Sequence, residues 1–111
     1  MISYKIKSLS NISFKGLSKL EESSQCSLDE SCEQPDGILI RSTKLDKEVL
    51  KDSLKAISRA GVGINNIPVD KCSEKGIVVF NTPGANANAV KELVLAGLML
   101  SSRNIFSSID F

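Results

Sequence analysis

The sequence predicts an α/β protein in which helices flank a parallel sheet. Segments typical of strands alternate with segments typical of helices along the whole chain. One of the strand segments, residues 37–40, is a short continuous apolar run, which suits a strand covered on both faces. The chain has 111 residues, of which 41% are apolar and 24% charged, and this composition predicts one globular domain with a single core.

Five segments have the residue pattern of strands. The first alternates apolar and polar side chains, and the last is the clearest strand of the chain. The predicted strands are residues 4–9, 37–40, 55–58 and 76–80, and a short strand near residues 25–28 is expected within residues 21–36, which otherwise read as a polar loop. Because the strands of a parallel sheet all end at one edge, we expect the loops that follow them to meet there.

Capping residues predict where the two early helices begin. Asn11 or Ser13 can cap a helix that ends near Leu20. Asp46 can cap a short helix over residues 47–50.

The segment RAGVGINN, residues 59–66, begins like a dinucleotide-binding loop because its glycines are spaced as G-x-G. Asn66 stands where the third glycine of such a loop is expected. Asn65 or Asn66 can instead cap a helix that has Pro68 in its first turn and ends at Gly76. We therefore interpret the segment as a different loop, whose glycines expose backbone N–H groups.

The last predicted helix begins at Asn86 or Asn88, runs to about Arg103 and is apolar on two sides. The main apolar stripe contains Val90, Leu93, Val94, Gly97 and Leu98. The opposite side contains Leu95, Ala96 and Met99. A helix that is apolar on more than one face must be buried on more than one face. We expect another domain or subunit to cover part of it; the alternative is a helix deep in its own core.

Three of the converging loops carry groups that bind anions. They are residues 41–44, 61–65 and 81–84. Arg41 can hold an anion with two parallel hydrogen bonds, and backbone N–H groups around Val62 and Gly63 can form an anion-binding nest. Together they predict a site for a small carboxylate or phosphate ester, although each feature alone also fits a surface charge or a turn.

The composition disfavours several classes of function. A net charge of +1 gives no global basic field for nucleic acid or anionic lipid. The chain has no histidine, so we expect no metal site. Three cysteines, Cys26, Cys32 and Cys72, fit reduced thiols in the cytoplasm. The apolar run over residues 93–100 is too short to span a membrane.

Three ordered segments carry a resemblance to a known family. They read GILIRSTK over residues 37–44, RAGVGINNIPVDKCSEKGIVVFNT over residues 59–82 and PGANANAVKELVLAGLMLSSR over residues 83–103. In this order they resemble the amino-terminal part of the D-3-phosphoglycerate dehydrogenases, which belong to the NAD-dependent D-2-hydroxyacid dehydrogenases. The resemblance covers residues 2–108.

The resemblance implies a flavodoxin-like substrate-binding domain over residues 1–87. Residues 88–111 then form an interdomain or dimerisation helix that leads to a Rossmann domain, which would bind NAD and is absent from this chain. The implied reaction oxidises a small anionic 2-hydroxy acid to a 2-oxo acid in serine biosynthesis. The implied partner of the helix at residues 88–103 is that Rossmann domain or a second subunit.

The resemblance also implies substrate-binding residues by their positions. They are Arg41, Ser42, Lys44, Val62, Gly63 and Asn81. Arg41 and Lys44 would hold an anionic group, and the backbone of Val62 and Gly63 would hold the substrate carboxylate. Val62 and Thr82 are the implied contacts with NAD, and Val62 is the one implied to lie near its nicotinamide end.

The chain departs from the family in its catalytic groups. The family's catalytic arginine, glutamate and histidine and its GxGxxG loop lie beyond residue 111. We therefore expect a fragment, a truncated gene product or a half that works with a separate partner. It should be inactive alone, because hydride transfer needs a general base and a bound cofactor.

Two alternatives to a dehydrogenase segment remain open. The first is a non-catalytic interaction module that docks through its last helix. The second is a phosphoacceptor receiver domain, which residues 9–12 disfavour because they contain no acid.

Overall fold

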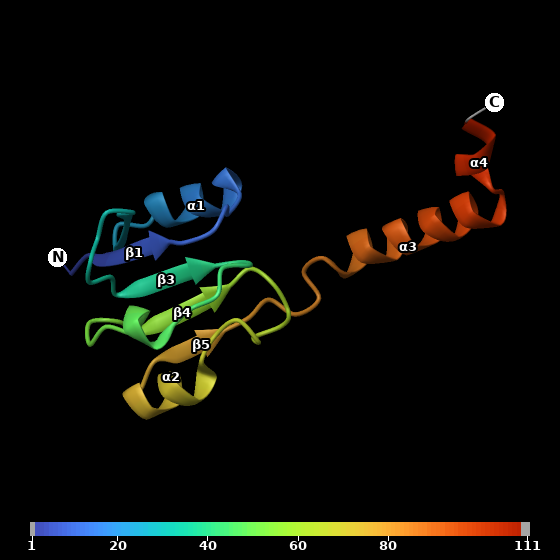
Figure 1. Cartoon of the computed structure of the whole chain (residues 1–111). Coiled ribbons are helices and arrows are strands. Elements are labelled where there is room, and N and C mark those ends of the chain that lie inside the picture. Colours follow the sequence, from blue (N-terminus) through green and yellow to red (C-terminus); the bar gives the residue numbers. More distant parts are fainter. Residues whose placement is uncertain (1, 110–111) are drawn as a thin grey trace.

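The computed structural model describes residues 2–109 and contains one five-stranded sheet (Figure 1). The strand order is β2-β1-β3-β4-β5, and every pairing is parallel. The strands are β1 Tyr4–Ser8, β2 Cys26–Leu28, β3 Gly37–Ile40, β4 Ala56–Arg59 and β5 Val78–Phe80. The α/β class is confirmed, as are all five predicted strands to within two residues at each end. Residue 1, in the predicted substrate-binding domain, and residues 110–111, in the predicted interdomain segment, lie outside the described residues.

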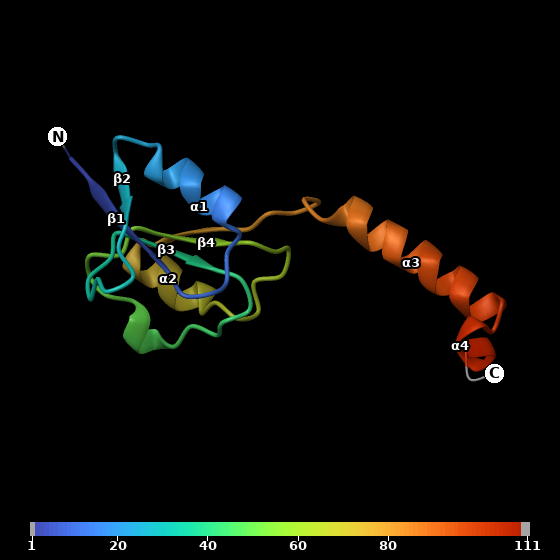
Figure 2. The same ribbon diagram turned by 90° about the horizontal axis from the view of Figure 1, so that it is seen from above.

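Two helices flank this sheet, one on each side, and further helices lie between and after the strands along the chain. The helices are α1 Phe14–Glu21, the 3-10 helix η1 Lys47–Val49, α2 Val69–Lys75, α3 Ala87–Ser102 and α4 Ile105–Ile109. α1 contacts β2 and α2 contacts β5, and Figure 2 shows these two helices on opposite sides of the strands. The resulting layers match the flanked sheet that the alternating pattern predicts.

The hydrophobic core lies between the sheet and the segments around η1 and α2. Ile38 of β3 is paired with Ile57 of β4, and both side chains are buried. The thiol of Cys72 packs against this face from α2 and is also fully buried. The remaining buried members of the core are Ile40, Leu45, Leu50, Leu54, Ile67 and Ile77. This packing fixes β3 and β4, whose carboxyl ends lead into the predicted anion-binding loops at residues 41–44 and 61–65.

The start of α2 differs from the prediction. The helix begins at Val69, so Pro68 precedes its first residue instead of lying in its first turn. Neither Asn65 nor Asn66 caps it, and the Asn66 amide is used on a different loop. The prediction was wrong because a side chain that can cap a helix can also satisfy carbonyl groups that are distant in the sequence.

Three other helix starts are correct in position but not in capping. Ser13, Asp46 and Asn86 occupy the residues before α1, η1 and α3, and none of their side chains bonds a helix N–H. Gly76 ends α2 with φ of 71°, in the left-handed region that favours glycine, as the sequence predicts.

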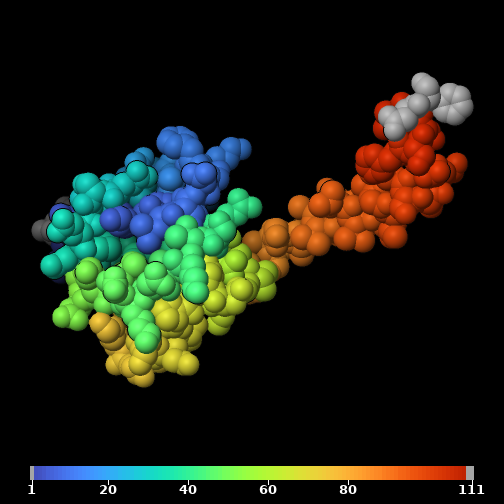
Figure 3. Space-filling model, viewed as in Figure 1, coloured from blue at the N-terminus to red at the C-terminus, as the bar shows by residue number. Residues whose placement is uncertain are grey.

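α3 extends away from the sheet as an arm (Figure 3). Residues 81–86 connect it to β5, and α3 packs against α4. Leu100 is half-buried, and every other residue of α3 is exposed, with Leu93 and Met99 at 75% and 67% exposure. The alternative of a helix deep in its own core is therefore wrong. No other part of the described residues buries the apolar side chains of α3.

Candidate functional site

The three loops predicted to converge lie side by side at the carboxyl edge of the sheet. The N–H of Thr82 donates to the carbonyl oxygen of Gly61 at 2.9 Å, which joins the loop after β5 to the loop after β4. Asn66 Nδ2 donates to the carbonyl oxygens of Thr43, at 2.8 Å, and Arg41, at 3.2 Å. These two bonds join the loop after β4 to the loop after β3, so the convergence is confirmed.

A fourth loop, which sequence reasoning missed, lies at the same edge. It follows β1 and spans residues 9–13. Within it, Ser10 Oγ accepts a hydrogen bond from the N–H of Arg41 at 2.9 Å. The signal was available, because the rule that collects the loops after parallel strands applies to β1 as well.

Arg41 is fixed through its backbone and leaves its side chain exposed. Its N–H donates to Ser10, and its carbonyl oxygen accepts from Arg59 Nε at 2.8 Å and from Asn66 Nδ2 at 3.2 Å. Side chains from two other loops and from β4 therefore hold the two polar backbone groups of one residue. A cation whose backbone is fixed while its guanidinium faces solvent is suited to binding an anion from outside.

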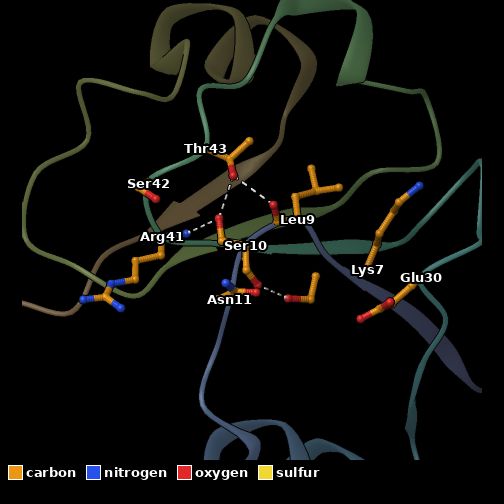
Figure 4. A pocket seen from close by; sticks show the side chains of 9 residues that line it. Lys7, Leu9, Ser10, Asn11, Glu30, Arg41, Ser42 and Thr43 are labelled. Atoms are coloured by element: carbon orange, nitrogen blue, oxygen red, sulfur yellow. Dashed lines mark hydrogen bonds between the residues drawn. The ribbon is translucent and has the colours of Figure 1, made fainter.

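Two open grooves meet at Arg41. The larger, of about 870 Å³, is lined by Lys7, Ser8, Leu9, Ser10, Asn11, Glu30, Arg41, Ser42 and Thr43. The smaller, of about 450 Å³, is lined by Asn11, Ile12, Ser13, Arg41, Ala60, Gly61, Thr82, Ala85 and Asn86. Figure 4 shows the Arg41 guanidinium directed away from Lys7 and Glu30, which lie at the other end of the larger groove.

The glycine loop after β4 presents backbone N–H groups. Within residues 2–109, the N–H groups of Val62 and Gly63 have no hydrogen-bond partner, so both are available to an anion. Arg59 Nη1 donates to the carbonyl oxygen of Gly63. A Cβ at Gly63 would lie 2.9 Å from that Nη1, and the residue does not have a positive φ. Glycine here does not serve a left-handed turn, and a side chain at this position would require only the flexible end of Arg59 to shift.

The polar side chains after β5 hold the glycine loop. Asn81 Nδ2 donates to the carbonyl oxygen of Val62 at 2.9 Å. The Thr82 hydroxyl lies 3.4 Å from the carbonyl oxygens of Arg59 and Gly61. Asn81 and Thr82 thus shape the segment that carries the available N–H groups.

The structure does not bring every expected site residue into the two grooves. Ser42 lines the larger groove, whereas Lys44 is exposed and lines neither. Val62 and Gly63 border the site through their backbone and line neither groove. Arg41 lines both grooves and is joined to the glycine loop through Arg59.

Three groups have shifted pKa values. The hydroxyl of Ser31, 2.7 Å from Oδ1, lowers the pKa of Asp29, next to Glu30 of the larger groove. The backbone N–H of Lys5, followed by the ammonium of Lys55, lowers the pKa of Asp36 at the amino-terminal edge of the sheet. Burial raises the pKa of the Cys72 thiol. These shifts concern the fold, and the anion-binding character of the site comes from Arg41 and the N–H groups.

The described residues form neither a metal site nor a dinucleotide-binding loop. Among residues 2–109, no three His, Cys, Asp or Glu side chains come together to hold a metal ion. The glycine loop does not lead directly into a helix, because α2 begins only at Val69, whereas a pyrophosphate is held at the N-terminus of the helix that follows such a loop. No helix in this part of the chain is long and apolar enough to cross a membrane.

Comparison with known proteins gives a family match over most of the chain. Residues 3–108 match the model of the D-isomer specific 2-hydroxyacid dehydrogenase catalytic domain. A D-3-phosphoglycerate dehydrogenase of Methanocaldococcus jannaschii is 40% identical over 79 residues, which are 68% of this chain and 15% of that protein. A hydroxypyruvate reductase of Thermotoga maritima is 44% identical over 73 residues, covering 63% of this chain and 24% of that protein. The matched part is therefore a quarter or less of these relatives.

Solved structures show the same fold. An NAD⁺-bound 3-phosphoglycerate dehydrogenase of Entamoeba histolytica superposes with a TM-score of 0.73 and 28% identity, over 88% of this chain and 39% of that one. The TT0316 protein of Thermus thermophilus superposes with a TM-score of 0.85 and 23% identity, over 96% of this chain and 39% of that one.

Proposed function

Because the chain belongs to the D-isomer specific 2-hydroxyacid dehydrogenase family, we propose that it is the substrate-binding segment of an NAD-dependent enzyme of the D-3-phosphoglycerate dehydrogenase type. The complete enzyme would oxidise a small anionic 2-hydroxy acid to a 2-oxo acid, a step of serine biosynthesis if the substrate is 3-phosphoglycerate. Relatives named for phosphoglycerate and for hydroxypyruvate both support a small anionic substrate.

One observation carries this proposal: Arg41 is held by its backbone at the meeting point of the loops, with its guanidinium exposed in two grooves. Such a group can bind the phosphate of a phosphorylated hydroxy acid with two parallel hydrogen bonds. The N–H groups of Val62 and Gly63 then bind the carboxylate at the other end of the substrate. Ser42, which lines the larger groove, adds a hydroxyl, and Lys44 and Asn81 keep supporting roles in the proposal although they line neither groove.

The chain would supply only part of the active site. NAD would be held chiefly by a Rossmann domain, because the glycine loop of this chain does not form a cradle for a dinucleotide. Val62 and Thr82 would contact NAD, with Val62 near its nicotinamide end. The chain contains no histidine to act as general base, so we propose that the 111 residues alone do not catalyse hydride transfer.

The arm would provide the contact with the rest of the enzyme. We assign residues 1–87 to the substrate-binding domain and residues 88–111 to the interdomain or dimerisation segment. The exposed apolar side chains of α3 support this assignment, because they are left without cover within the described residues. The partner would be the NAD-binding domain or a second subunit.

A calorimetric titration with D-3-phosphoglycerate tests the proposed site. The wild-type chain should bind it, and Arg41→Ala should weaken binding by about 10- to 100-fold, as expected for the loss of charge-assisted hydrogen bonds. Arg103→Ala, which removes an exposed arginine at the end of α3, is the matched control and should change nothing. D-glycerate, which lacks the phosphate, should bind more weakly than D-3-phosphoglycerate. Equal affinity of the wild type and Arg41→Ala would remove Arg41 from this role.

A second candidate function is a non-catalytic interaction module that docks through α3. The exposure of Leu93 and Met99 on the arm favours it. Size-exclusion chromatography and amide hydrogen exchange distinguish this candidate. A chain that runs as a monomer with well-protected α3 amides has no exposed docking helix, and this result would argue against it.

A further inference from the structure

Arg41, Ser10, Thr43 and Leu9 form one continuous chain of hydrogen bonds at the edge of the sheet (Figure 4). The N–H of Arg41 lies 2.9 Å from Ser10 Oγ, and Ser10 Oγ lies 2.8 Å from Thr43 Oγ1. The hydroxyl of Thr43 donates to the carbonyl oxygen of Leu9 at 2.8 Å. The chain crosses between the loop after β1 and the loop after β3.

The donor and the acceptor of every hydrogen bond in this series are determined. A hydroxyl has a single proton to donate. Thr43 uses its proton on Leu9, so it can only accept from Ser10, and Ser10 must donate to Thr43. The lone pair of Ser10 is then free to accept the N–H of Arg41. All the bonds therefore run head to tail, an arrangement in which each bond polarises and strengthens the next.

Within residues 2–109, the hydrogen bond to Ser10 is the one that joins Arg41 to the loop after β1. The carbonyl of Arg41 is already held from the other side by Arg59 and Asn66. If the Ser10 hydroxyl were removed, the Arg41 N–H would lose its partner and Thr43 Oγ1 would lose its donor. The backbone of Arg41 would then be held at one end only.

We propose that Ser10 is a positioning residue of the anion site and that its hydroxyl sets the place from which the Arg41 side chain reaches the ligand. The proposal rests on the proposed function, because it assumes that Arg41 binds the anion. Ser10 acts through Arg41 and does not itself need to touch the ligand. Asn11, the next residue of the same loop, lines both grooves with Arg41.

A double-mutant cycle in the full chain tests the proposal. D-3-phosphoglycerate is titrated into the wild type, Ser10→Ala, Arg41→Ala and the double variant, with the fold of each checked by circular dichroism. Ser10→Ala should weaken binding about fivefold, the effect of one neutral hydrogen bond. In the Arg41→Ala background the same change should have no further effect, because Ser10 acts only through Arg41.

Conservative variants separate positioning from general stability. Ser10→Thr keeps the hydroxyl and should bind like the wild type. Ser18→Ala removes a hydroxyl that bonds a carbonyl within α1, and as the matched control it should leave binding unchanged. Amide exchange of Arg41 provides a readout without ligand. It should be about fivefold faster in Ser10→Ala and unchanged in Ser10→Thr.

The outcomes distinguish the two proposals. If Arg41→Ala weakens binding but Ser10→Ala does not, or if the two effects are additive, the role of Ser10 is overturned and that of Arg41 stands. Unchanged exchange of the Arg41 amide in Ser10→Ala also overturns it. If neither the wild type nor any variant binds the ligand, both the proposed function and the role of Ser10 are overturned.

Discussion

Arg59 Nε donates to the carbonyl oxygen of Arg41 at 2.8 Å, so one arginine at the edge of the sheet holds the other in place. The sequence presents both as cations near the ends of neighbouring strands. In the fold they have different roles. The guanidinium of Arg59 is occupied by carbonyl oxygens of Arg41 and Gly63, whereas that of Arg41 is exposed in the grooves.

Arg59→Met should therefore disturb the site without removing a group that contacts the ligand. The variant loses the bonds to the loops after β3 and β4, and we expect the free energy of unfolding to fall by about 1–2 kcal/mol. Binding of D-3-phosphoglycerate should weaken as well, because Arg41 loses part of its support. Urea unfolding and calorimetry measure the two effects, with Arg103→Met as control. A stability equal to that of the wild type would show that these bonds contribute nothing.

Asp36 should make the stability of the fold depend on pH. Its carboxylate accepts the backbone N–H of Lys5 at 2.9 Å and lies 2.9 Å from Lys55 Nζ, and these contacts lower its pKa. A carboxyl group with a lowered folded-state pKa adds stability above its unfolded value, here near 3.8, and this stability is lost as the pH falls through the folded value.

The variant Asp36→Asn should consequently be about 1–2 kcal/mol less stable than the wild type at pH 7, with a difference that shrinks below about pH 4. Urea unfolding of the two proteins at pH 7 and at pH 3 measures this difference in stability. Asp52→Asn is the control, because that carboxylate is fully exposed and lies 3.9 Å from its nearest cation, Lys75. A difference that stays constant between pH 7 and pH 3 would contradict the role given to the Asp36 charge.

Gly76→Ala should destabilise the sheet domain through the backbone alone. A Cβ at this position meets nothing within 4 Å, but φ of 71° is unfavourable for alanine, so the expected loss is about 1–2 kcal/mol. Gly84 also has a positive φ, at 77°, but lies in the connection to α3. Gly84→Ala should leave the main unfolding transition unchanged, because that connection can relax without opening the core. Equal losses in the two variants would show that the connection is part of the cooperative unit.

A chain that ends at residue 87 tests the proposed domain boundary. Since α3 packs against α4 and its side chains are exposed, removing both should change the free energy of unfolding of the sheet domain by less than about 0.5 kcal/mol. A chain that ends at residue 75 is the control and should not fold, because it lacks β5 and the buried Ile77. Loss of cooperative unfolding in the longer of these two chains would place the boundary elsewhere.

The sequence predicts the framework of this site well because the framework depends on local patterns. Apolar runs identify the strands, and parallel topology then places the loops containing Arg41, Val62 and Thr82 at one edge. Both steps use residues that are close together in the chain. The same rule, applied to the first strand, would have included Ser10.

The details that fix the site are not local, and this is why they were missed. Asn66 looks like a helix cap in the sequence, but its amide bonds the carbonyls of Arg41 and Thr43, 25 and 23 residues away. Ser10 and Arg41 are 31 residues apart. The residues next to Asn66 or Ser10 in the sequence do not indicate these distant hydrogen-bond partners, because the folded sheet brings the partners together.

The separation of α3 from the sheet gives the two parts of the chain different kinetics. The sheet pairs residues far apart in sequence, such as Ile6 with Gly37, and such pairs must close long loops before they gain contacts, which slows folding to milliseconds or longer. A free helix the size of α3 forms and melts within about 1 μs. While the sheet assembles, the arm therefore passes many times between its helical and unfolded forms. A partner surface that binds the arm later binds the helical form, which is already present in that helix–coil equilibrium.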